Sequence, residues 1–271
     1  MGNEQVLGVT KVVNALLAKP VLALLALLHI RPESAEYPIT NSFSMELLVV
    51  LLAMIFFLWL KTRISIDRPG ATQQIMEFVI TNPMGIGVKD LVDDIVGHGA
   101  EGQVPLFGTI GLFILFSNLI SLVPGLSSPT AAATVPLGCA IIVFLHYNRL
   151  GIGHHGPVGY AKTLVGPVWW IFIITVPVET ISHFARLLSL TVRLWANMMV
   201  SELIYVSFLG LTLGLFNFLT HLGSLGYASA VVPVGIPLAM ALLHVFVAIL
   251  QAFVFVMLSV LYLGLAVSEE H

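Results

Sequence analysis

Long apolar runs separated by short polar stretches dominate the pattern of this sequence. A helix of about 20 apolar residues is long enough to cross a bilayer. With their flanks, the runs predict five membrane helices, of which the third is the shortest, and turn residues separate most of them. The predicted spans cover residues 45–61, 105–123, 134–147, 168–220 and 231–267.

The last two predicted spans are longer than a bilayer requires. No proline or glycine occurs between Pro177 and Gly210, so the pattern predicts one helix without a turn. About 30 helical residues extend about 45 Å, whereas the hydrocarbon core is about 30 Å thick. We therefore expect a long, strongly tilted helix hairpin, whose return lies at the glycine-rich segment 221–226.

Residues 69–102 have a different pattern. Apolar residues recur at helical spacing among charged ones, as in Val88, Leu91, Val92 and Ile95. This pattern is typical of an amphipathic helix that lies on a membrane surface. We expect it to lie on the cytoplasmic side.

The positions of basic residues predict the orientation. Lys61 and Arg63 follow the first span, and Arg149 and Lys162 flank the segment 151–160, which we expect to be a loop. Because positive charge favours the cytoplasmic side, the N-terminal segment 1–40 is predicted outside and the C-terminus in the cytoplasm.

Composition agrees with the pattern. The chain has 58% hydrophobic and 9% charged residues and a mean hydropathy of +1.01, whereas soluble domains carry about 25% charged residues. We predict an all-α integral membrane protein with a single membrane domain over residues 1–271. The sequence has no cluster of basic residues that would bind nucleic acid and no phosphate-binding glycine loop. His154 and His155 have no further ligands at suitable spacing, so no metal or cofactor is expected.

Only four charged residues occur between Leu164 and Ser268. Each charge at membrane depth costs about 2.5–3.5 kcal/mol on insertion scales, which makes them functional candidates. At 100° per residue, several polar residues lie within about 40° of Arg193 on one face. This stripe comprises Glu179, Ser182, Arg186, Ser189, Arg193 and Asn197. Glu202 lies about 180° away, and His183 is off the stripe and is predicted to be structural.

The last helix has a polar stripe of its own, formed by His244, Gln251 and Tyr262. Folding the hairpin about residue 224 brings Glu202 level with His244 and Asn197 level with Gln251. We therefore expect Glu202 to contact His244 and Asn197 to contact Gln251, to within about one helical turn.

These residues can handle protons. A carboxylate and an imidazole can relay protons near neutral pH, whereas Arg193 stays charged. Glu179 and Glu202 lie about 21 and 14 Å from Arg193 along the helix, which suggests two offset half-pathways. In the second span, Asn118 and Ser121 share one face and serve either this path or interhelical packing.

Two groups of residues carry a resemblance to a known family. The first is SLTVRLWANM at residues 189–198, followed by Glu202-Leu203-Ile204. The second comprises Leu243-His244, Leu250-Gln251-Ala252-Phe253 and Tyr262-Leu263. With Asn118, they make the chain from residue 45 onward resemble subunit a of rotary F-type ATP synthases. Two departures are Ala196, where many relatives have glycine, and Ser121, where many have an acidic or amide residue.

The resemblance implies a non-catalytic, proton-translocating stator subunit in the cell (inner) membrane. Arg193 would face the ring of c subunits, with Asn197 as its polar neighbour. The implied outer half-channel holds Glu202, His244 and Gln251, and the cytoplasmic one Glu179 and Ser189. Asn118 and Tyr262 match positions of the family's signatures. The implied partners are the c-ring, peripheral-stalk b subunits, other ATP synthase subunits and the lipid bilayer.

Two other classes of function remain open from the residues alone. An autonomous proton channel or secondary transporter would conduct in liposomes without partners. A structural membrane scaffold would tolerate Arg193→Ala with pumping intact.

Overall fold

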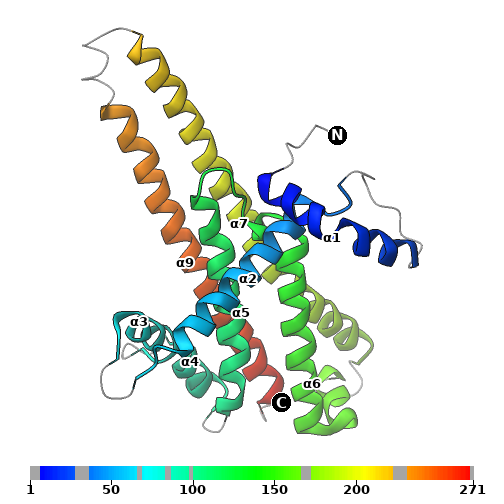
Figure 1. The fold of residues 1–271 in the computed structure, drawn as a ribbon. Coiled ribbons are helices and arrows are strands. Elements are labelled where there is room, and N and C mark those ends of the chain that lie inside the picture. The colour runs from blue at the N-terminus through cyan, green and yellow to red at the C-terminus, as the bar shows by residue number, and fades with distance from the viewer. Residues whose placement is uncertain are drawn as a thin grey trace.

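A bundle of long helices makes up the computed structural model of this chain (Figure 1). The structure describes residues 7–27, 37–65, 69–82, 87–97, 100–165, 172–221 and 231–268, which form helices and no strand. Among these described residues, five helices are long and apolar enough to cross a membrane, which confirms the predicted class and number of membrane helices. The α-helices are α1 (Gly8–Leu27), α2 (Asn41–Lys61), α3 (Ala71–Ile80), α4 (Val88–Ile95), α5 (Val104–Leu119), α6 (Thr134–Val165), α7 (Phe172–Thr220) and α9 (Val231–Val267), and the 3₁₀ turns are η1 (Ala100–Gln103), η2 (Ile120–Leu122) and η3 (Pro129–Ala131).

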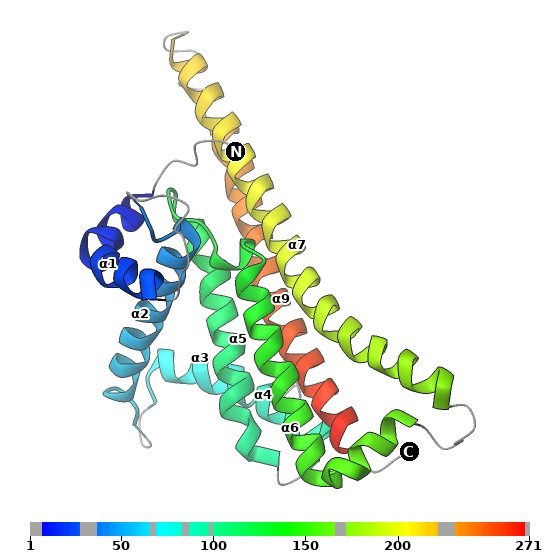
Figure 2. The same ribbon diagram turned by 90° about the vertical axis from the view of Figure 1, so that its right-hand side faces the viewer.

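Helices α7 and α9 form the predicted hairpin. They run side by side in both views, and α7 crosses α5 and α6 obliquely (Figures 1 and 2). The 49 residues of α7 extend about 74 Å, so it must tilt or project beyond a bilayer. The predicted long hairpin is therefore confirmed and its tilt in a membrane stays a prediction; most of its predicted return, residues 222–226, lies outside the described residues.

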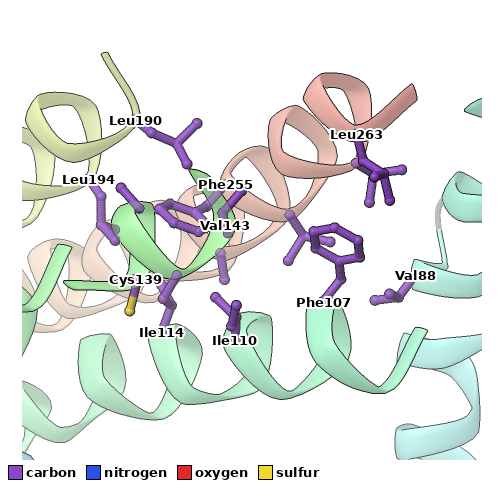
Figure 3. Packing of buried hydrophobic residues seen from close by; sticks show 14 of the residues in the cluster. Val88, Phe107, Ile110, Ile114, Cys139, Val143, Leu190, Leu194, Phe255 and Leu263 are labelled. Carbon is purple, nitrogen blue, oxygen red and sulfur yellow. The ribbon is translucent and has the colours of Figure 1, made fainter. Parts of the chain in front are cut away.

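The buried core lies where α5, α6, α7 and α9 meet, with α4 at one end (Figure 3). Leu194 of α7, Ile114 of α5 and Val143 of α6 are each buried to 1% exposure or less. Gly264 of α9 lies directly against α4, because an added Cβ would lie 2.9 Å from the backbone oxygen of Ile95. This packing holds one face of α7 inward and leaves the opposite face uncovered.

Helix α1 lies at one end of α2, and α3 and α4 lie at the other (Figures 1 and 2). At one end, the Asn14 side chain ties α1 to the segment before α2 through two hydrogen bonds of 3.0 Å with the backbone of Ile39. At the other end, the predicted amphipathic segment forms α3 and α4. Helix α4 buries Val88, Leu91 and Val92, as its apolar spacing predicts.

The predicted loop at residues 151–160 is wrong. Helix α6 continues through it and is interrupted only at Gly156, where φ is +71° and Pro157 follows. A single glycine in the left-handed region redirects the chain, and helical bonding resumes beyond it. Consequently, His154 and His155 lie on a helix, not on a loop.

Candidate functional site

Arg193 lies on the uncovered face of α7. Ser189, Arg193 and Asn197, spaced four residues apart, are exposed, whereas Leu190 and Leu194 are buried in the core. Helical periodicity therefore separates a polar, outward-facing row from an apolar, inward-facing one. Among the residues that the structure describes, no carboxylate pairs with Arg193.

Gln251 of α9 lies close to Arg193. Both line one small void between α7 and α9, and Gln251 is only 6% exposed. Asn197, the predicted partner of Gln251, is exposed, and no hydrogen bond is found between the two amides; Gln251 lies instead beside Arg193, one turn away, which is within the predicted tolerance of one turn. Counting residues from the turn assumes that the two helices run side by side without crossing. When helices cross at an angle, only some of their faces come into contact.

Glu202 is held by the connection between α5 and α6. Its two carboxylate oxygens accept from the backbone N–H of Ser128, at 3.3 and 3.2 Å. The Ser128 hydroxyl lies 2.6 Å from the Thr130 hydroxyl, which donates to Asn118 Oδ1 at 2.6 Å. Polar contacts thus lead from Glu202 to the backbone of Ser128, and from the Ser128 hydroxyl through Thr130 into the buried part of α5.

His244 lies at the other end of this chain of contacts. Its Nε2 is 3.0 Å from Ser121 Oγ and 3.2 Å from the backbone oxygen of Asn118. Its Nδ1 is 2.8 Å from Ser201 Oγ. The predicted level of His244 is right to within one residue, but its predicted direct contact with Glu202 is wrong. The neighbouring residue Ser201, about 100° around the helix, faces α9 instead.

We call this assembly the hydroxyl network. It comprises Asn118, Ser121, Ser128, Thr130, Ser201, Glu202 and His244. Sequence reasoning missed Ser128, Thr130 and Ser201. Only the position of Ser201 beside Glu202 offered a signal, because the other two lie in an uncharged connection without helical periodicity.

A second polar region surrounds Glu179 near the start of α7. It is a cavity of about 290 Å³ between α6, α7 and the end of α9. We call it the polar cavity; it is lined by His155, Tyr160, Glu179, His183, Arg186, Leu265, Ala266 and Ser268. Glu179 Oε1 lies 3.7 Å from Arg186 Nη2 and 3.9 Å from His183 Nε2.

Two aromatic residues border this cluster. The Arg186 guanidinium lies over the Tyr262 ring, 5.7 Å from its centroid, so Tyr262 belongs with the polar cavity and not with His244. His183 Nδ1 lies 3.5 Å from the Tyr147 hydroxyl. His183 was predicted to be structural, and its contact with Glu179 makes it a further candidate, which the i, i+4 spacing could have indicated.

The two polar regions lie on opposite sides of Arg193 along α7. Glu179 is about 21 Å and Glu202 about 14 Å from it by helical rise. The polar cavity is lined by Leu265, Ala266 and Ser268 at and just beyond the end of α9, whereas the hydroxyl network meets α9 at His244, in the first half of that helix. The arrangement can bind protons at two levels, with a permanent positive charge between them.

The chain is similar to proteins of one known family. The model of the family described as "ATP synthase A chain" matches residues 43–264. The protein named ATP synthase subunit a of Koribacter versatilis is 37% identical over 262 residues, which are 97% of each chain. Its namesake in Solibacter usitatus is 37% identical over 92% of this chain and 95% of that one. ATP synthase subunit a of Desulfosudis oleivorans is 40% identical over 75% of this chain and 78% of that one.

Proposed function

The chain belongs to the ATP synthase A chain family, and we propose that it is the non-catalytic stator subunit that couples proton flow to rotation of a ring of c subunits. As a subunit of the membrane sector of ATP synthase, it is a multi-pass membrane protein.

The observation that carries the proposal is the exposure of Arg193. A guanidinium at membrane depth requires a negative partner or water, and the described part of this chain supplies no carboxylate to it. The residues around Arg193 on this face include Val192 and Val200, which are 50% and 49% exposed. A face on which Arg193 is the only charge, with Ser189 and Asn197 beside it and apolar side chains around them, fits a partner helix that carries one carboxylate.

The two polar regions supply the half-channels. A proton enters through the hydroxyl network and neutralises the carboxylate of a c subunit, which then rotates into lipid. On the other side, a carboxylate releases its proton to the polar cavity around Glu179. Arg193 holds the deprotonated carboxylate and prevents direct leakage. Each charge that crosses contributes about 2.3 kcal/mol per 100 mV.

The proposed orientation follows from the basic residues. Lys61 is the last residue of α2 and Arg63 follows it, and Arg149 lies in α6 shortly before His155 and Tyr160, which line the polar cavity. Positive charge favours the cytoplasmic side, so the polar cavity opens to the cytoplasm and α1 lies outside. The peripheral-stalk b subunits and the remaining subunits of the complex then contact surfaces other than the Arg193 face.

Replacing Arg193 by alanine tests the coupling. We expect ATP-driven proton pumping in inverted membrane vesicles to fall by at least about 100-fold, because both the capture of the carboxylate and the prevention of proton leakage depend on the fixed charge of Arg193. ATP hydrolysis and subunit content should show an intact complex. Arg149→Ala is the matched control and should pump normally. Pumping that survives Arg193→Ala in an assembled complex would exclude this function.

Cysteine cross-linking tests which face meets the c-ring. With Cys139 replaced by alanine, Asn197→Cys should cross-link to cysteines near the carboxylate of a c subunit. Leu194→Cys lies next to Arg193 but is 1% exposed, so it should not react. Proton uptake by the purified chain alone in liposomes would instead favour an autonomous channel.

A further inference from the structure

Ser201 occupies a position that the proposed pathway does not yet explain. It lies on α7 immediately before Glu202, and its hydroxyl is 2.8 Å from Nδ1 of His244. We propose that the Ser201 hydroxyl is the group through which His244 gains and loses its proton. This inference rests on the proposed function, since it assigns a relay residue within the outer half-channel.

The hydrogen-bond partners determine which ring nitrogen of neutral His244 carries a hydrogen. Nε2 lies 3.2 Å from the backbone oxygen of Asn118, and a carbonyl oxygen can only accept. The Ser121 hydroxyl donates to the same oxygen at 3.0 Å, so it too can only accept from Nε2. Nε2 therefore carries the hydrogen, and Nδ1 has the free lone pair.

Proton uptake by His244 must then occur at Nδ1. The neighbour of Nδ1 is Ser201, whose hydroxyl donates to it in the neutral state. When a proton arrives at Ser201 Oγ, the original O–H bond breaks as the Nδ1–H bond forms, and Ser201 remains a neutral hydroxyl. His244 becomes an imidazolium, and release runs through the same atoms in reverse.

The other neighbours of His244 offer no equivalent route. Glu202 is directed to the backbone N–H of Ser128 and has no hydrogen bond to the ring. Tyr205 lies with its ring centroid 5.9 Å from that of His244, and its hydroxyl donates to the backbone oxygen of Leu122. His244 itself is 1% exposed, which leaves little room for water to bypass Ser201.

Substitution of Ser201 in the assembled ATP synthase tests the relay. We expect Ser201→Ala to lower ATP-driven proton pumping about fivefold, which is the scale of one lost hydrogen bond. Ser201→Thr keeps the hydroxyl and should restore pumping to within about twofold of the parent. Ser259→Ala is the matched control, because that buried hydroxyl bonds only the backbone of its own helix, at Phe255, and it should pump normally.

The outcomes separate the inference from the function on which it rests. The relay is overturned if Ser201→Ala pumps normally, or if Ser201→Thr loses as much pumping as Ser201→Ala. In either case the proposed function still stands if Arg193→Ala loses pumping. Pumping by Arg193→Ala overturns both. If Ser201→Ala does not assemble, Ser201→Cys replaces it, since a thiol is a weaker donor. Pumping by Ser201→Cys below that of Ser201→Thr supports the relay, and equal pumping overturns it.

Discussion

The hydroxyl network and the polar cavity differ in how their polar groups meet. In the hydroxyl network, neutral groups and one carboxylate lie 2.6–3.3 Å apart. Asn118, Ser121 and His244 are each at most 2% exposed. In the polar cavity, Glu179 lies 3.7 Å from Arg186 and 3.9 Å from His183, around open space of about 290 Å³. The side chains of Glu179 and Arg186 are 34% and 25% exposed.

This difference indicates two ways to conduct protons. Buried groups in direct contact pass a proton along hydrogen bonds, so every member is needed and an unpaired one is costly. In an open cavity, water can bridge groups that do not touch and can replace a missing one. We therefore expect the hydroxyl network to be sensitive to single substitutions and the polar cavity to tolerate them.

The sharpest test compares the same substitution in the two regions. Glu202→Gln removes the only carboxylate of the hydroxyl network, and we expect ATP-driven pumping to fall about 100-fold, within the range for loss of a positioned acid or base. Glu179→Gln leaves water and His183 in the polar cavity, so we expect a loss of no more than about threefold. Both are measured in inverted vesicles at equal amounts of assembled complex.

Two results would contradict this comparison. Equal losses at the two positions would mean that the polar cavity is as dependent on one carboxylate as the hydroxyl network. A larger loss at Glu179 would reverse the assignment of the water-filled half-channel.

A smaller effect is expected from Thr130→Val, which keeps the shape of the side chain and removes its hydroxyl. Asn118 Oδ1 would lose its donor in a fully buried position, and the link from Ser128 would be broken. An unpaired buried acceptor costs about 1–3 kcal/mol, so we expect pumping to fall about tenfold. Thr180→Val is the control, because that exposed hydroxyl bonds only its own helix, at Val176. Unchanged pumping in Thr130→Val would remove Thr130 from the relay.

The sequence was sufficient to predict the helices and the face that carries Arg193. Both depend on length, periodicity and the absence of glycine and proline, which are local properties. The same phase argument separates the exposed Arg193 from the buried Leu194 one residue later. The continuation of α6 past residue 151 was missed, because glycines and a proline also occur where a helix only bends.

The partners of each polar side chain could not be predicted in the same way. Ser201 and Glu202 are adjacent in the sequence, and a shift of one residue in the packing of α7 decides which of them contacts His244. Ser128 and Thr130 reach the site through a 3₁₀ turn in a connection without periodicity. Such contacts depend on the angle and position at which helices cross, and the spacing of residues along one helix gives no information about either.

The smallest predicted effect concerns Tyr262, which distinguishes a packing role from a relay in the polar cavity. Tyr262→Leu removes the ring beneath the Arg186 guanidinium, an interaction that contributes about 0.5 kcal/mol at the low end for exposed sites, so pumping should fall about two- to threefold. Tyr262→Phe keeps the ring and should pump like the parent. A loss in Tyr262→Phe equal to that in Tyr262→Leu would assign a role to the hydroxyl, and the polar cavity would then conduct partly through side chains, as the hydroxyl network does.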